Sequence, residues 1–131
     1  MSAPFRLTII GAGSVGFTRK LISDILCVPE FAGVEIALTD TNQHNLDMVS
    51  EIIQRIVDVN KLPAKVIATT DRREALKGAR YVIVGDLGEA WDFRALIRAF
   101  RLLREPGAEL IALGMTKPTR IATTASRLSR T

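Results

Sequence analysis

The sequence predicts an α/β fold in three layers, α/β/α, built around a sheet of parallel strands. Short apolar runs alternate with longer stretches that have the helical period, and this alternation favours parallel strands joined by right-handed crossovers. A glycine-rich turn at residues 11–16 follows the first apolar run, where a strand would pass into a helix. Together these observations predict a Rossmann-like, five-stranded parallel sheet in the order 3-2-1-4-5, with strands 1 and 4 at the switch point where ligands bind.

The first half of the chain is expected to supply three strands and two helices. The expected strands are Phe5–Ile10, Val34–Thr39 and Lys65–Thr70. The helix after the glycines should end near Val28, because proline follows it. Its expected buried stripe is Val15, Leu21, Ile22, Ile25 and Leu26. A second helix, capped by Thr41 or Asn42, has an apolar face. That face consists of Leu46, Val49, Ile53, Ile56 and Val57.

The second half continues the alternation. Asp71 is expected to cap a short helix, Arg72–Lys77, which ends at Gly78. The apolar run Tyr81–Val84 is typical of a strand buried on both faces. The remaining expected elements are a helix at Glu89–Arg104, a strand at Glu109–Gly114 and a last helix from Pro118. With 131 residues and no linker-like stretch, the chain is expected to form one domain over residues 1–131.

The turn Gly11-Ala-Gly-Ser-Val-Gly16 has the GxGxxG spacing of dinucleotide-binding loops. Gly11 is expected to allow the tight turn, and Gly13 to let a pyrophosphate approach the backbone. Gly16 is expected to let the helix pack closely on the strand. The N–H groups of Ser14 and Val15, together with the helix dipole, would hold the phosphates. The predicted cofactor-binding residues are Gly11, Ala12, Gly13, Ser14, Val15, Gly16, Asp40 and Asp86.

Asp40 ends the second expected strand and lies 24 residues after Gly16, close to the place of the carboxylate that binds a ribose hydroxyl. Its charge disfavours NADP, whose 2′-phosphate it would repel, so NAD is the expected cofactor and a dinucleotide the expected partner. Asp86 follows the fourth strand, where it would either cap a helix or contact the ligand. Candidate walls of the adenine pocket are Ile10, Thr39, Thr41, Thr69 and Val84.

Charge and composition argue against several other classes of function. The net charge is +4, but three arginines in the second half of the chain fall on one face of a predicted helix and are not interleaved with aromatic residues. We therefore interpret them as a solvated helix face and expect no nucleic acid as a binding partner. No apolar run approaches the roughly 20 residues needed to cross a bilayer. The arginines concerned are Arg94, Arg98 and Arg101, opposite Leu96, Ile97, Phe100 and Leu103.

The single cysteine, Cys27, and the single histidine, His44, do not suggest a metal site. Apolar neighbours predict that Cys27 is a buried core thiol, and His44 is expected on the surface. One cysteine cannot form an internal disulfide, which suits a reducing compartment, so the expected location is the cytoplasm. Tyr81, the only tyrosine, is expected to serve in packing.

Three segments resemble the N-terminal part of the family 4 glycoside hydrolases. They are the glycine loop with the helix after it (residues 11–26), Ile36-Ala-Leu-Thr-Asp40, and Thr69-Thr-Asp-Arg-Arg-Glu-Ala-Leu-Lys-Gly-Ala79. The resemblance is nearly continuous over Phe5–Val84 and is strongest to the α-glucosidase and α-galacturonidase branch. It implies tight NAD binding with manganese, and transient oxidation of the sugar followed by elimination, an exception to two-carboxylate glycoside hydrolysis.

Beyond Val84 the resemblance is interrupted. Gly85-Asp-Leu-Gly88 and Phe93-Arg-Ala-Leu96 are similar to a GDT-x-GPGG segment and the helix behind it, but the family's metal-binding cysteine and histidine and its catalytic tyrosine have no counterpart here. Lys117 stands where the family has the asparagine before Pro118. The resemblance therefore implies a nucleotide-binding domain with an internal excision and a C-terminal truncation, whether natural or engineered. We expect no catalytic and no metal-binding residue.

Three functional hypotheses follow. The first is an NAD(H)-binding domain that performs no hydrolysis alone. The second is an active NAD-dependent α-glycosidase. The third is a scaffold that has lost ligand binding. Removal of a lobe would also expose apolar surface, and this predicts a homo-oligomer, such as a homodimer, formed through that surface.

Overall fold

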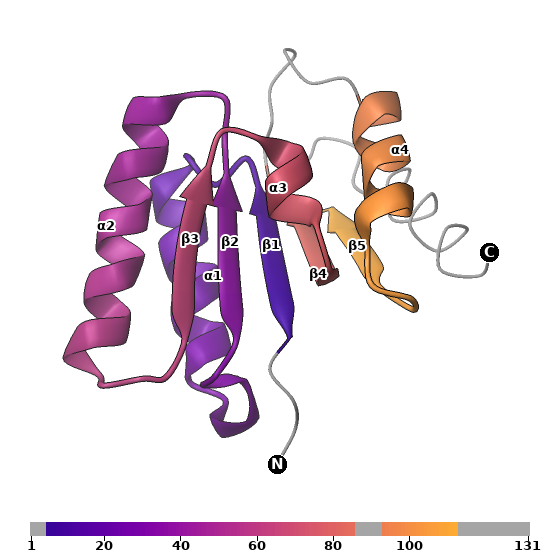
Figure 1. The fold of residues 1–131 in the computed structure, drawn as a ribbon. Coiled ribbons are helices and arrows are strands. Elements are labelled where there is room, and N and C mark those ends of the chain that lie inside the picture. The colour runs from indigo at the N-terminus through magenta and orange to yellow at the C-terminus, as the bar shows by residue number, and fades with distance from the viewer. Residues whose placement is uncertain (1–4, 86–92, 113–131) are drawn as a thin grey trace.

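The computed structural model describes residues 5–85 and 93–112, and its centre is a five-stranded sheet in which all neighbouring strands are parallel (Figure 1). The strand order is β3-β2-β1-β4-β5. This confirms the predicted fold class and strand order. The strands are β1 (Arg6–Ile10), β2 (Glu35–Thr39), β3 (Lys65–Thr69), β4 (Ala79–Val84) and β5 (Glu109–Ala112).

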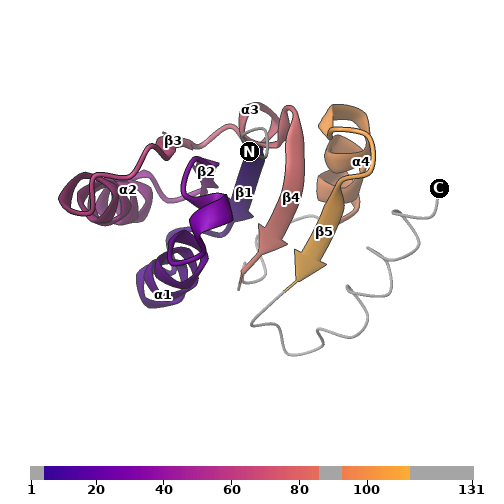
Figure 2. The same ribbon diagram turned by 90° about the horizontal axis from the view of Figure 1, so that it is seen from below.

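Helices cover both faces of the sheet. Figure 2 shows α1 and α2 on one side, and α3 and α4 on the other. The helices are α1 (Val15–Leu26), α2 (Gln43–Val59), α3 (Arg72–Leu76) and α4 (Phe93–Leu103), with a 3₁₀ turn η1 at Pro29–Phe31. Because every strand runs the same way, the loops that follow β1, β2 and β4 gather at one edge of the sheet, and the glycine loop belongs to this edge.

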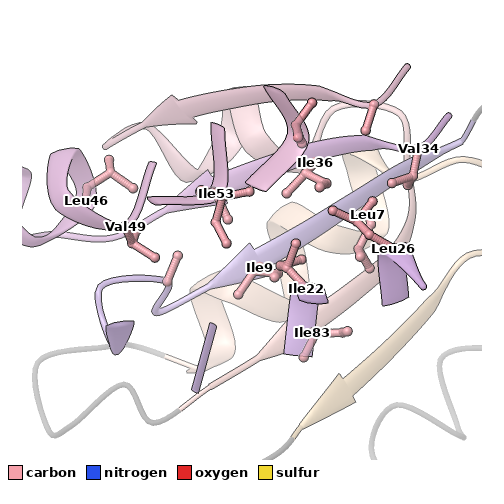
Figure 3. Packing of buried hydrophobic residues seen from close by; sticks show 14 residues of the cluster. Leu7, Ile9, Ile22, Leu26, Val34, Ile36, Leu46, Val49, Ile53 and Ile83 are labelled. Atoms are coloured by element: carbon pink, nitrogen blue, oxygen red, sulfur yellow. The ribbon is translucent and has the colours of Figure 1, made fainter. Parts of the chain in front are cut away.

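The core on the α1 and α2 side is aliphatic and well buried (Figure 3). Leu7 and Ile9 of β1 point into it, two residues apart as strand geometry requires. Ile22 and Leu26 of α1 meet them from the helix layer, one helical turn apart. Other members of this cluster are Val34, Ile36, Leu46, Val49, Ile53 and Ile83. The predicted apolar faces of α1 and α2 are the faces that pack on the sheet.

The opposite face of the sheet has a second core beneath α3 and α4. Ile10 of β1, Val84 of β4 and Phe100 of α4 are buried together there. The hydroxyl of Thr8 lies on the same face and donates a hydrogen bond of 2.6 Å to the carbonyl of Ala75. The adjacent residues of β1 thus divide between two cores, which explains why Leu7, Ile9 and Ile10 are apolar and why the buried Thr8 hydroxyl needs its backbone partner.

Side-chain caps start two of the helices as the sequence predicts. Asn42, rather than Thr41, caps α2: its Oδ1 accepts a hydrogen bond of 3.0 Å from the Asn45 N–H. Asp71 caps α3, accepting from the Arg73 N–H at 2.9 Å. Each cap satisfies an N–H that the first helical turn leaves without a partner. These caps help to fix where the chain turns back at the edge that holds the glycine loop.

Several details differ from the predictions. The prediction that Cys27 is a core thiol is wrong, because α1 ends at Leu26 and the cysteine lies at its C-cap, exposed. Ile22 and Leu26 face the sheet, and the residue after Leu26 is rotated about 100° away from them. Strand β4 begins at Ala79, two residues before the predicted start. The residues before Phe93 in the predicted fourth helix, and the predicted last helix, lie outside the described residues.

The surface of α4 agrees with the prediction of a solvated face. Arg98 and Arg101 are exposed, whereas Leu96 and Phe100 are buried. None of the helices within residues 5–85 and 93–112 is long and apolar enough to span a membrane.

Candidate functional site

The glycine loop is held against the end of β2 by its own backbone. The N–H groups of Gly11 and Ala12 both donate to the carbonyl of Thr39, at 3.0 Å each. Gly11 has a φ of 79°, a left-handed conformation that costs a residue with a Cβ about 1–2 kcal/mol. The tight-turn role predicted for Gly11 is therefore confirmed by the geometry.

Asp40 lies directly against this loop. Its Oδ2 accepts a hydrogen bond of 2.8 Å from the Gly13 N–H, and its Oδ1 accepts one of 2.9 Å from the Asn42 N–H. Two backbone donors therefore fix the carboxylate in one orientation. Since an ionised carboxylate has about four acceptor positions, each oxygen still has a lone pair for a further donor.

Gly13 is glycine because the Asp40 carboxylate occupies the space that a side chain would need. A Cβ at residue 13 would lie 2.7 Å from Asp40 Oδ2 and 2.9 Å from Asn45 Cβ. Its N–H is also engaged, so Gly13 serves first to seat the carboxylate. The predicted approach of a pyrophosphate to this residue stays a prediction.

The start of α1 offers N–H groups to an anion. Ser14 is the N-cap but makes no side-chain cap, and the first turn contains no acidic residue. The N–H groups of Val15, Gly16 and Phe17 are the first in the helix and have no carbonyl one turn before them. With the helix dipole they give this end of α1 a partial positive charge. The Ser14 N–H, in contrast, faces the Gly11 carbonyl at 3.3 Å and is less available than predicted.

A side-chain hydrogen bond joins the glycine loop to α1. The hydroxyl of Thr18 is completely buried and donates to the Ala12 carbonyl at 2.8 Å. Thr18 was not among the predicted site residues. A hydroxyl residue one turn into the helix after the glycine loop is the sequence feature that could have indicated it. Thr18 orients the Ala12 peptide and so helps to hold the loop in shape before any ligand binds.

The packing role predicted for Gly16 is wrong in this structure. Gly16 is exposed, and a Cβ built on it would have no atom within 4 Å. The reason is its position on the helix: the inward-facing residues of the first turns are Phe17 and Thr18, and Gly16 faces outward. Its place in the predicted cofactor site stays a prediction, and the open space beside it leaves the helix start accessible.

The end of β4 adds a residue that the sequence reasoning did not assign to the site. Gly85 donates to the Ile10 carbonyl at 2.9 Å and is buried beside the loop. A Cβ there would lie 3.3 Å from the Phe17 ring and 3.6 Å from the Gly11 carbonyl oxygen. The sequence feature that could have assigned Gly85 to the site is a glycine directly after the apolar run of the strand that neighbours β1. Asp86, the predicted contact that follows it, lies outside the described residues.

The candidate adenine-pocket residues do not form an open wall. Ile10, Thr39 and Val84 are completely buried, whereas Thr41 is exposed and Thr69 is half-buried. The strand register places Thr69, Thr39, Ile10 and Val84 in one row across the sheet, and the three on β2, β1 and β4 are the ones that are completely buried. The Thr39 hydroxyl is buried without a hydrogen-bond partner in the described structure.

Metal ligands do not gather in the part of the chain that the structure describes. No three His, Cys, Asp or Glu side chains there lie close enough to hold one ion. His44 is exposed near the start of α2, and Cys27 lies at the far end of α1. The described residues therefore assign no ligand to a manganese ion.

Comparison with known proteins decides the family. The sequence model described as family 4 glycosyl hydrolase matches residues 6–89, which include the glycine loop, Asp40 and Gly85. The chain belongs to family 4 of the glycosyl hydrolases. The family match thus contains every part of the site described above.

Curated relatives include glycosidases of both gluco- and galacto-type. The chain is 62% identical over 81 residues to an α-galactosidase of Rhizobium meliloti (strain 1021), covering 62% of this chain and 16% of that protein. It is 37% identical over 91 residues to an α-glucosidase of Erwinia rhapontici, covering 66% of this chain and 20% of the relative. The family 4 chain therefore spans only a fifth or less of the length of these two relatives.

Solved structures share the fold at low sequence identity. A 6-phospho-α-glucosidase from gut microorganisms, in complex with NAD and glucose-6-phosphate, has a TM-score of 0.79 at 14% identity, covering 95% of this chain and 35% of that chain. A 6-phospho-α-glucosidase from gut microorganisms in complex with NAD and Mn²⁺ has a TM-score of 0.75 at 16% identity, covering 97% of this chain and 36% of that chain. Malate dehydrogenase of Naegleria fowleri has a TM-score of 0.70 at 16% identity, covering 98% and 45%. These likenesses confirm the Rossmann fold of the family 4 chain.

Proposed function

We propose that residues 1–131 act as one domain that binds NAD(H), with the pyrophosphate at the start of α1 and the adenosine ribose at Asp40. The observation that carries this proposal is the Asp40 carboxylate, which two backbone N–H groups hold beside the glycine loop. A carboxylate fixed in this way loses little side-chain conformational entropy when it accepts hydrogen bonds from ribose hydroxyls. NAD-bound solved structures with the same fold support the choice of ligand.

The site offers one set of groups that suits the pyrophosphate of NAD(H) and another that suits its adenosine ribose. Free N–H groups and the helix dipole at the start of α1 suit a pyrophosphate, and the outward-facing Gly16 keeps that helix end open. The ionised Asp40 suits the 2′- and 3′-hydroxyls of a ribose. It repels a 2′-phosphate, so the site should discriminate against NADP.

The catalytic contribution of this domain would be indirect. When bound, the nicotinamide would supply hydride-transfer chemistry to a sugar substrate, and the residues described here would bind and orient the dinucleotide. We assign no catalytic residue and no metal ligand to them. The α-galactosidase and α-glucosidase relatives support an α-glycoside as the substrate class of a whole enzyme of this type, and such hydrolysis is not expected from this chain alone.

Calorimetric titration of the cofactor-stripped chain with NAD⁺ tests the proposal. We expect saturable binding with a Kd near millimolar, the level left when about 4 kcal/mol of contacts is missing from micromolar binding. Asp40→Ala should abolish it. Asp71→Ala is the matched control, because Asp71 also follows a strand and also accepts a backbone N–H, but at the start of α3.

The outcomes separate the three hypotheses. Binding lost in Asp40→Ala and kept in Asp71→Ala supports the proposal. No heat with millimolar NAD⁺, while circular dichroism shows the chain to be folded, would favour a scaffold that has lost its ligand. Release of nitrophenol from a nitrophenyl α-galactoside, dependent on NAD⁺ and Mn²⁺, would instead favour an active glycosidase.

A further inference from the structure

A groove between α1 and α2 lies away from the glycine loop, toward the C-terminal ends of both helices. Its volume is about 660 Å³, within the range of about 300–1,000 Å³ that small-molecule clefts occupy. Figure 2 shows the two helices on the same side of the sheet, running beside one another. The groove is separate from the proposed dinucleotide site, which is formed at the opposite end of α1.

The floor of this α1–α2 groove is apolar. Leu26 is almost completely buried, and Ile52, Ile56 and Leu62 are partly buried along the groove. Val59 forms part of its rim and has 72% of its surface exposed. Aliphatic side chains lining a concave surface favour an apolar ligand, because burial of that ligand removes both surfaces from water.

Two arginines give the groove a charge of one sign. Arg19 of α1 and Arg55 of α2 both line it, and both are exposed. Among the described residues neither guanidinium has an ion-pair or hydrogen-bond partner. Arg55 also lines a second hollow on α2, together with Asp47, Glu51 and Asp58, whereas no carboxylate is among the residues that line the α1–α2 groove. Positive charge at an apolar groove is complementary to a ligand that has an anionic end.

We propose that the α1–α2 groove binds a small amphipathic carboxylate, a molecule with an aliphatic body and one anionic end group. The aliphatic body would lie on Leu26, Ile52 and Ile56, and the carboxylate would face Arg19 and Arg55. The helix C-termini carry partial negative charge, so the anionic end is placed at the arginines and the apolar end toward Val59 and Leu62. This site neither requires nor excludes binding of NAD(H) at the other end of α1.

The only cysteine of the chain makes the test specific. Cys27 lines the groove and is exposed, so a bound ligand would shield its thiol from reagents. The rate of alkylation by N-ethylmaleimide, a neutral reagent, would be measured on the full chain with increasing decanoate. We expect saturable protection by decanoate, little by decanol and none by acetate, because the first alone has both an aliphatic body and a charge.

Charge variants test the role assigned to the arginines. The double variant Arg19→Gln with Arg55→Gln should weaken decanoate binding about tenfold, the loss typical of removing exposed charge contacts to one anion. The matched control, Lys20→Gln with Lys65→Gln, removes the same net charge from exposed residues outside the groove and should leave protection unchanged. Surface substitutions of this kind rarely unfold a protein, and circular dichroism of each variant would verify its fold.

Each contrary outcome would overturn the proposal. Failure of decanoate to slow alkylation would exclude a ligand in the groove, and faster alkylation would show that decanoate merely unfolds the chain. Equal protection in the arginine and lysine variants would remove the role of charge. Protection that needs no decanoate and grows with protein concentration would show that a second copy of the chain covers the groove. None of these results depends on whether the chain binds NAD⁺.

Discussion

Gly13→Ala is the substitution for which the structure makes the sharpest prediction. The added Cβ would lie 2.7 Å from Asp40 Oδ2 and 2.9 Å from both Asp40 Cγ and Asn45 Cβ. Contacts this short are not tolerated, and Asn45 Cβ is fixed to the backbone of α2, so the Asp40 carboxylate must leave its place. The 2.8 Å hydrogen bond from Gly13 to Asp40 would then be lost.

The expected magnitude follows from two contributions. Loss of a hydrogen bond to a charged group costs about 1.5–3 kcal/mol, and overpacking costs about 1–3 kcal/mol. Because the Gly13–Asp40 pair is only partly buried, we expect the lower part of the combined range, about 2.5–4 kcal/mol of unfolding free energy. In urea this corresponds to a midpoint lowered by roughly 1–2 M, for a typical slope of unfolding free energy on denaturant.

Urea denaturation followed by circular dichroism would measure this change. Gly33→Ala is the control, since its Cβ would meet nothing nearer than Pro63 Cγ at 3.9 Å, and it should leave the midpoint nearly unchanged. In an Asp40→Ala background, Gly13→Ala should cost much less, because the clashing carboxylate is gone, although the contact with Asn45 remains. A Gly13→Ala protein as stable as the wild type, or an equal cost in both backgrounds, would refute the reasoning.

Three further substitutions test the surroundings of the site by the same unfolding measurement. Thr39→Val should raise the free energy of unfolding by up to about 1 kcal/mol, because it removes a buried hydroxyl that has no partner in the described structure; a loss of stability would mean that the hydroxyl is satisfied in solution. Asn42→Ala should cost about 1 kcal/mol through loss of the α2 cap, and an unchanged midpoint would contradict the capping geometry. Gly11→Ala should cost about 1–2 kcal/mol, because φ is 79° there; no cost would contradict the left-handed turn.

The fold of this family 4 chain was predictable because its local signals agree with one another. The apolar period of α2 over Leu46, Val49 and Ile53 gave the buried face directly, and Asn42 and Asp71 marked two helix starts. Strand order followed from the alternation of strands and helices, since right-handed crossovers leave few arrangements. The misplaced start of β4 has a local cause: Ala79 is buried, but the second residue of the strand, Arg80, is exposed and charged, so the apolar run in the sequence starts only after it.

The glycine loop was predictable in its position but not in its detailed contacts. The GxGxxG spacing located the loop, yet it could not show that Gly13 makes room for the Asp40 carboxylate, because that contact joins residues 27 apart in the chain. It also assigned a packing role to Gly16, whose orientation depends on the rotation of α1 about its axis. Cys27 was misplaced for the same reason, since one residue along a helix turns a side chain from the core to solvent.

The central claim, that this loop binds NAD(H), is tested most directly by an NMR titration of the ¹⁵N-labelled chain with NAD⁺. We expect saturable shifts confined to the amides of residues 11–17, of Asp40 and of Gly85, all with one Kd, and no such shifts in the Asp40→Ala variant. Amides of Arg55 and Leu62, in the α1–α2 groove, should not move. Absence of shifts at millimolar NAD⁺, or shifts centred away from the glycine loop, would contradict binding of NAD(H) at this loop.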